Sequence, residues 1–173
     1  SGMCGDNVTY TFEESTGTLI ISGTGAMKDF MTTADCPWWN YKEKIQKLVI
    51  NPGIEVIGAY NFWDCTNLTT IVFSDDIKSI GAYAFSGCFN IKDVNIPNLS
   101  VWCGIKFENF QSNPLSYAQN LCVDGKPIYD VVIPDGFYKT VGDEIFVAGN
   151  PTYGFYSINN FYTEWNRYKG ELF

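Results

Sequence analysis

The side chains that most often carry catalysis are sparse in this sequence. It contains no histidine, so Ser-His-Asp and Cys-His machinery cannot form and the commonest metal ligand is missing. None of its six cysteines stands in a C-x-x-C pair with zinc-like spacing. Gly23-Thr24-Gly25 lacks the lysine and the helix start of a phosphate-binding loop. We therefore predict no catalytic residue, no cofactor and no metal.

Two pairs of adjacent carboxylates, Glu13-Glu14 and Asp75-Asp76, are the remaining candidates for acid-base chemistry. Glycoside hydrolysis needs only two acids that face each other about 5–9.5 Å apart. Adjacent acids in turns are far more often solvated loop residues. A glycosidase is therefore kept only as a third hypothesis, which requires two carboxylates across a cleft.

Aromatic side chains suggest a second kind of chemistry, because their faces stack on sugars. The candidates are Trp38, Trp39, Trp63, Trp102 and the C-terminal Tyr153, Tyr156, Tyr162, Trp165 and Tyr168. In a repeat protein such residues are usually core, and the adjacent Trp38 and Trp39 are well placed to cover the open end of the first repeat. A carbohydrate-binding module is the second hypothesis, and an exposed coplanar pair of rings would favour it.

An internal repeat determines where these residues must lie. The stretch 48–68 returns as 71–91, 23 residues later, with apolar, glycine, aromatic and cysteine positions matching together. This period indicates a leucine-rich-repeat solenoid, in which each unit buries its apolar face against its neighbours. We predict a β-rich α/β fold: a right-handed solenoid with short parallel strands, short helical turns and an N-terminal β-hairpin cap.

Residues 1–44 are predicted to be that cap. Val8, Tyr10 and Phe12 alternate with polar residues, and after a turn Leu19 and Ile21 alternate again. A period of two on both arms predicts a β-hairpin laid over the first coil.

The solenoid itself is predicted over residues 45–146. Each unit begins with a very short strand, at 48–50, 71–73 and 94–96, whose first and third side chains point inward and whose middle one points outward. The stretches 58–64 and 81–87 predict one or two helical turns on the opposite wall.

Core residues recur in these turns. Phe62 and Phe85 are predicted to be buried beneath the helical turns, with Ile57 and Ile80 completing the ring of core positions. Cys65 and Cys88 share a repeat position that favours buried free thiols. A disulfide between Cys4 and Cys36 stays open, since spacing alone does not support it.

The register loosens after the third unit. The next recognisable strand, 131–134, comes 37 residues after Val94, which predicts a variant unit at 99–129 with a capped helical turn at 113–118 and a hairpin on an Asp-Gly turn at 121–129. A fourth unit is expected to resume at 141–146. The aromatic tail 147–173 is expected to pack on the open end of the solenoid or to pair with a second molecule.

Charge and hydrophobicity restrict the partners. The net charge of −8 repels phosphate backbones and no Lys/Arg cluster offsets it, so we expect no nucleic acid. No apolar run approaches the length of about 20 residues that spans a bilayer, so we expect no membrane insertion. Ser1-Gly2-Met3 is typical of an expression remnant, and we expect that a signal peptide has been removed.

Several motifs together resemble the BspA-like leucine-rich-repeat proteins. They are I-G-A-Y-A-F-S-G-C at 80–88, V-V-I-P-D-G at 131–136, the leader elements C-G-D-N-V-T-Y, G-T-L-I-I-S-G-T-G-A-M and P-W-W-N-Y, and the pieces W-C-G-I-K-F and N-P-L. Asn61 and Ile145 stand where that pattern usually has alanine. The resemblance covers residues 4–146 and implies a secreted or cell-surface bacterial protein that binds protein partners such as host matrix or cell-surface proteins.

The leading hypothesis is therefore a non-catalytic protein-binding or adhesion module, with glycan as the alternative ligand. Leucine-rich-repeat solenoids commonly bind through the face of their sheet. Strand alternation predicts that the outward side chains form one continuous partner-binding face. These side chains are Lys47, Val49, Thr70, Val72, Asp93, Asn95, Asp130 and Val132.

Overall fold

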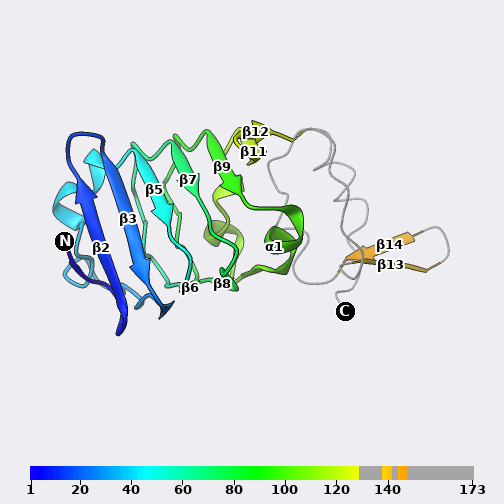
Figure 1. Ribbon diagram of the computed structural model, residues 1–173, viewed down its shortest axis with the longest axis horizontal. Coiled ribbons are helices and arrows are strands. Elements are labelled where there is room, and N and C mark those ends of the chain that lie inside the picture. Colours follow the sequence, from blue (N-terminus) through cyan, green and yellow to red (C-terminus); the bar gives the residue numbers. More distant parts are fainter. Residues whose placement is uncertain (129–137, 142–143, 148–173) are drawn as a thin grey trace.

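The computed structural model describes residues 1–128, 138–141 and 144–147. Its largest element is an eight-stranded sheet, hereafter the main sheet, whose strands stand side by side along the repeat block (Figure 1). In spatial order the strands are β1 (Gly2–Met3), β2 (Val8–Glu13), β3 (Thr18–Gly23), β5 (Lys47–Ile50), β7 (Thr70–Val72), β9 (Asp93–Ile96), β11 (Asn120–Val123) and β12 (Lys126–Pro127).

The five central strands of the main sheet, β3 to β11, run parallel and in register. One row of paired residues consists of Leu19, Leu48, Ile71, Val94 and Leu121, and each of these side chains is at most 1% exposed. The residues between them on each strand point outward, because successive side chains of a strand alternate between its faces. This confirms the predicted inward and outward positions of the three repeat strands.

The predicted N-terminal hairpin is present as β2 and β3, which pair antiparallel from Val8 opposite Gly23 to Glu13 opposite Thr18. Its position differs from the prediction. Because β3 pairs parallel with β5, the hairpin extends the main sheet by two strands instead of lying across the first coil.

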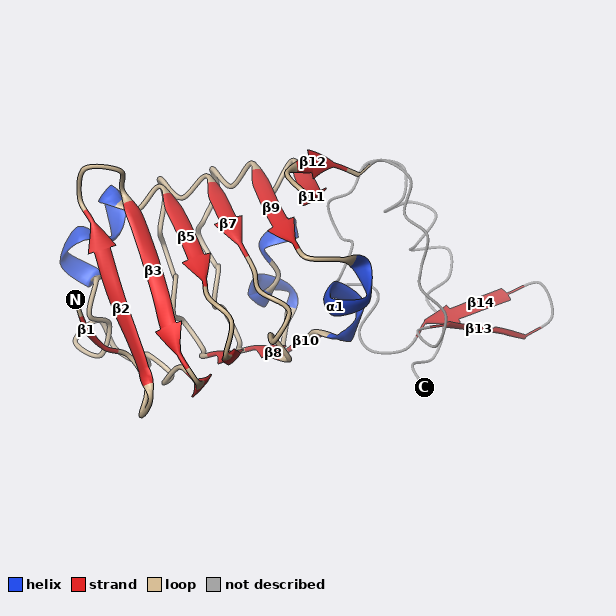
Figure 2. Ribbon diagram, in the orientation of Figure 1, coloured by secondary structure: helices blue, strands red, loops and turns tan. Residues whose placement is uncertain are grey.

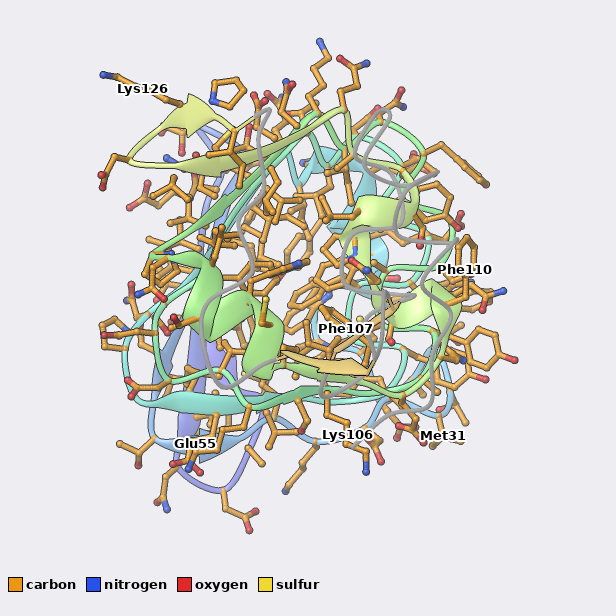
Figure 3. The ribbon with its side chains drawn as sticks, turned by 90° about the vertical axis from the view of Figure 1, so that its right-hand side faces the viewer. Met31, Glu55, Lys106, Phe107, Phe110 and Lys126 are labelled. Carbon is orange, nitrogen blue, oxygen red and sulfur yellow. The ribbon has the colours of Figure 1, made fainter. Side chains whose placement is uncertain are left out.

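A second sheet lies at one edge of each coil. It is parallel throughout, and its strands in spatial order are β10 (Lys106–Phe107), β8 (Ser79–Ile80), β6 (Ile54–Ile57) and β4 (Gly25–Ala26). The sequence reasoning placed Ile57 and Ile80 in the core but missed their strands, which are too short to show alternation. Figure 3, which looks along the stack, shows Phe107 in the interior while its neighbour Lys106 points outward.

The prediction of helical turns at 58–64 and 81–87 is wrong, because both stretches are turns without a helix. Tyr60, Asp64 and Tyr83 have φ near +60°, a left-handed conformation that a right-handed helix cannot contain. Alternate backbone donors of the first stretch bond to the next coil instead of four residues back: the Tyr60, Phe62 and Asp64 N–H groups donate to the carbonyls of residues 82, 84 and 86 at 2.7–3.0 Å.

Short helices lie elsewhere in the described residues (Figure 2). They are η1 (Trp39–Lys44), α1 (Leu99–Gly104), η2 (Phe110–Ser112) and η3 (Pro114–Ser116). The predicted capped turn at 113–118 is η3, where the Asn113 side chain accepts a hydrogen bond from the Leu115 N–H at 2.9 Å.

The variant unit contains a strand that the sequence reasoning misassigned. The predicted hairpin is present, since β11 and β12 pair antiparallel across Asp124 and Gly125, both with positive φ. However, β11 also pairs parallel with β9, so it is the next strand of the main sheet, ahead of the predicted 131–134. That segment lies outside the described residues, as does the tail from 148 onward.

The fourth unit expected at 141–146 also differs. Within the described residues of this region, β13 (Tyr138–Val141) and β14 (Glu144–Val147) pair antiparallel as a two-stranded sheet of their own.

A column of aromatic rings fills the interior of the repeat block. Trp38 stacks on Phe62 with ring centroids 5.5 Å apart, and Phe62 stacks on Phe85 at 5.3 Å. Phe85 then meets Phe73 edge-on at 6.4 Å, and Phe73 lies 5.8 Å from Trp102. All five are at most 4% exposed, which confirms the burial predicted for Phe62 and Phe85.

Asn61, which departs from the repeat pattern, joins the first coil to the N-terminal segment. Its fully buried side chain accepts a hydrogen bond from the Gly58 N–H at 2.9 Å and donates to the Lys28 carbonyl at 2.7 Å. Its backbone carbonyl accepts a hydrogen bond from the Trp38 indole at 2.9 Å. The equivalent residue of the next unit is Ala84, whose side chain is also fully buried but has no polar atoms.

Candidate functional site

The structure does not bring the two carboxylate pairs together. Glu14 lies in the β2–β3 turn and pairs with Lys44 at 2.6 Å, and the hydrogen bond from Lys44 lowers the pKa of its carboxyl. Asp76 follows β7 and accepts the Gly53 N–H at 2.7 Å. The two pairs therefore lie at opposite ends of the parallel strands. Neither pair lines the pocket beside Trp63 or the pocket lined by Asp29 and Glu108.

All six cysteines are free, so Cys4 and Cys36 are not bonded to each other. Cys65 and Cys88 are fully buried, as their shared repeat position predicted. Burial raises the pKa of Cys88 to about 12 and that of Cys65 well above its ordinary value. Among the described residues, no group of three or more His, Cys, Asp or Glu could hold a metal ion.

The tryptophan pair splits between core and surface. Trp38 is fully buried and begins the aromatic column, whereas Trp39 is half-buried and stacks on Trp63 with centroids 5.6 Å apart and planes at 28°. These two rings lie face to face, so they are not the coplanar, side-by-side pair that would favour the sugar hypothesis. Lys42 Nζ lies 3.8 Å from the Trp39 ring centroid and 2.6 Å from Asp64 Oδ2.

The outward side of the main sheet brings together six of the eight predicted binding residues. Pairing between β5, β7 and β9 aligns Lys47 with Thr70 and Asp93, and Val49 with Val72 and Asn95. Lys47 is exposed and the other five are half-buried. We call these six residues the sheet face. Asp130 and Val132, the remaining two, lie outside the described residues.

The same registers extend the sheet face with residues that the sequence reasoning missed. On β3, Ile20 pairs with Val49, and on β11 Asn120 pairs with Asp93; both side chains are half-buried and continue the two rows. Thr18 and Cys122 lie at the neighbouring register positions but are only 8% and 2% exposed, so they add little accessible surface. Alternation around the inward Leu19 and Ile21 could have revealed Ile20. The sequence does not predict Asn120, because the pattern at 121–129 indicates a hairpin and gives no sign that β11 also pairs with β9.

Hydrogen bonds between coils hold the polar side chains of the sheet face. Asn95 Nδ2 donates to the Ile71 carbonyl at 3.2 Å, and Asn120 Nδ2 donates to Asp93 Oδ1 at 2.8 Å. Ile20, Val49 and Val72 form an apolar row beside them. The result is a surface with an apolar row, the cation of Lys47 on β5 and the carboxylate of Asp93 on β9.

Comparison with known proteins agrees with the repeat. A family model described as "BspA type Leucine rich repeat region (6 copies)" matches residues 38–148. No curated protein matches the chain. In the described residues, no helix is long and apolar enough to cross a membrane.

Two solved structures are similar over 60% of this chain. A leucine-rich repeat protein from Eubacterium ventriosum ATCC 27560 is 29% identical with a TM-score of 0.45, and one from Bacteroides ovatus ATCC 8483 is 24% identical with a TM-score of 0.33. The matched part covers 29% and 33% of those chains, so this chain spans well under half of their length.

Proposed function

The chain belongs to the BspA-type leucine-rich-repeat family, and on that premise we propose that it is a non-catalytic protein-binding module that uses the sheet face. The observation that supports the proposal is the register of β5, β7 and β9, in which Lys47, Thr70 and Asp93 align in one row and Val49, Val72 and Asn95 in the next. Such a surface offers contact area and hydrogen bonds, which suit contact with a protein better than catalysis.

The sheet face is organised in advance of binding. Because the polar side chains of Asn95 and Asp93 already bond across coils, a partner does not have to immobilise them. Association loses less free energy when the side chains at an interface are ordered beforehand. The valines supply apolar area at little further entropic cost, since β-branched side chains have few rotamers.

Adhesion at a bacterial surface is the biological setting that we propose, with a host matrix or cell-surface protein as partner. The family's association with bacterial surface proteins supports an extracellular location. The net charge of −8 keeps the module soluble and favours partners that present a basic or neutral surface.

A binding screen followed by a charge-reversal variant tests the proposal. Purified extracellular-matrix proteins are screened by surface plasmon resonance. For any partner found, Val72→Glu together with Asn95→Lys should weaken binding at least about tenfold, or ~1.4 kcal/mol, because both changes place charges in the sheet face. The urea midpoint should move little, since both side chains are only half-buried.

Val56→Glu together with Asn40→Lys is the matched control. It makes the same changes of charge at a half-buried and an exposed position away from the main sheet, in β6 and η1. Affinity should be unchanged in this variant. Equal affinity of the sheet-face variant and the parent would exclude the sheet face as the binding surface.

A further inference from the structure

A pocket of about 330 Å³ lies on the turn side of the solenoid, away from the sheet face. In Figure 3 its lining residue Met31 appears on the side of the molecule opposite the main sheet. The other lining residues are Phe30, Thr32, Thr33, Cys36, Trp39, Tyr60 and Trp63. Pockets for small ligands have volumes of about 300–1,000 Å³, mostly apolar walls and a few polar groups, so this one suits a single small ring.

The rings of Trp39, Trp63 and Tyr60 form a corner of the pocket wall. Trp63, which is 42% exposed, is backed by Trp39, and the Tyr60 ring meets Trp63 edge-on at 85° with centroids 6.2 Å apart. Tyr60 is itself backed by Tyr83, stacked at 5.1 Å. Each ring that faces the pocket is therefore held in place by another ring, and a ligand gains apolar contact without ordering flexible side chains.

The charges around this corner favour a neutral ligand. No charged side chain lines the pocket. The cation that contacts its rings is Lys42, whose Nζ lies 3.8 Å from the Trp39 centroid and 5.8 Å from the Trp63 centroid. This ammonium already makes the cation–π contact with Trp39, and its positive charge would repel a cationic ligand. Its pairing with Asp64 leaves no free positive charge for an anion.

Hydroxyl groups complete the chemistry. Thr33 and Tyr60 line the pocket, and within the described part of the chain neither hydroxyl has a hydrogen-bond partner in the structure. A ligand should therefore be neutral, carry one apolar face for the rings and present hydroxyl groups at its rim. A pyranose sugar has this combination, since its axial C–H bonds form an apolar face while its hydroxyls point outward.

We propose that the corner formed by Trp39, Tyr60 and Trp63 binds a neutral pyranose unit of a glycan, at a site separate from the sheet face. One sugar face stacks on Trp63, and Thr33 and Tyr60 bond its hydroxyls. A module with both sites could contact protein and glycan at once, and binding at two linked sites strengthens attachment without new contacts at either.

Direct titration tests the site. Glucose, galactose, mannose and N-acetylglucosamine are titrated up to about 50 mM, with tryptophan fluorescence and calorimetry as readouts. Choline and glucose 6-phosphate serve as charged probes. At least one neutral sugar should bind, and both charged probes should bind more weakly. Failure of every neutral sugar, or tighter binding of either charged probe, would overturn the proposal.

Variants locate the binding. Trp63→Ala should weaken the sugar's affinity at least about tenfold, and Thr33→Val, which keeps the shape but removes a hydroxyl, about fivefold. Phe89→Ala is the matched control, because Phe89 is 68% exposed on another turn and contacts Tyr117. It should leave affinity unchanged. Unchanged affinity in both pocket variants would place the sugar elsewhere and refute the site.

Cysteine labelling gives a readout that does not depend on affinity. Cys36 lines the pocket and is half-buried, whereas Cys103 is half-buried but outside it. Saturating sugar should slow maleimide labelling of Cys36 and leave Cys103 unaffected, as mapped by mass spectrometry. Equal protection of both would indicate general stabilisation and count against the pocket.

Discussion

At the scale of single residues, the aromatic column makes Phe85 one of the most sensitive positions. It is fully buried and touches both Phe62 and Phe73. Phe85→Ala should leave a cavity and lower the free energy of unfolding by about 3–5 kcal/mol, measured from the urea midpoint. The exposed Phe89→Ala should change it by less than about 0.5 kcal/mol. A Phe85 variant as stable as the parent would contradict the column.

The buried thiol of Cys88 makes stability depend on alkaline pH. Its pKa rises from 9.0 to about 12 because burial disfavours the thiolate. The folded protein therefore keeps a proton that the unfolded chain loses above about pH 9. The contribution of Cys88 to stability is complete below that pH and is lost as the pH rises toward 12.

Cys88→Ser separates this effect from other titrations. The serine hydroxyl can still donate to the Phe62 carbonyl, as the Cys88 thiol does at 3.1 Å, but it does not ionise in this range. The free energy of unfolding should fall less steeply between about pH 8 and 11 in the variant than in the parent. Parallel pH profiles would mean that Cys88 is not protected.

At the scale of elements, the turn between β11 and β12 depends on its glycine. Gly125 has φ of +71°, and a Cβ added there would meet no atom within 4 Å. Gly125→Ala should therefore cost about 1 kcal/mol through the left-handed backbone alone. Asp124→Asn is the control and should be neutral, since Asn-Gly suits the same turn. Urea titration measures both, and a larger loss would indicate a contact that the structure does not contain.

Elements differ in how far the sequence predicts them. The strands of the main sheet were predictable because the repeat sets inward residues such as Leu48 and Ile71 in fixed register. The turns at 58–64 were mistaken for helices because Gly58, Phe62 and Cys65 also fit helical spacing. What decides against a helix is the neighbouring coil, whose carbonyls accept the Tyr60, Phe62 and Asp64 N–H groups. The sequence of a single repeat unit does not indicate that these acceptors exist, because they belong to the next unit.

At the scale of the whole molecule, continuous ring contacts join the first coil to the variant unit, from Trp38 through Phe62, Phe85 and Phe73 to Trp102. In so short a repeat block we expect one cooperative transition. Trp38→Phe and Trp102→Phe each remove one reporter from an end of this chain of contacts. In each variant, the urea midpoint measured by tryptophan fluorescence should equal the midpoint measured by far-UV circular dichroism. Separate midpoints would show that the coils unfold independently.

The sequence alone determined the repeat, the inward positions, the buried Phe62, Phe85, Cys65 and Cys88, and the family resemblance. These follow from periodicity, because a side chain that recurs every 23 residues must occupy the same place in every coil. Only the tertiary structure decided which residues of neighbouring coils contact one another. It made β11 a strand of the main sheet, gave Asn61 the Lys28 carbonyl as partner and set Tyr60 against Trp63 as the wall of a pocket. Each of these depends on residues from different units, and spacing along one chain does not specify which units touch.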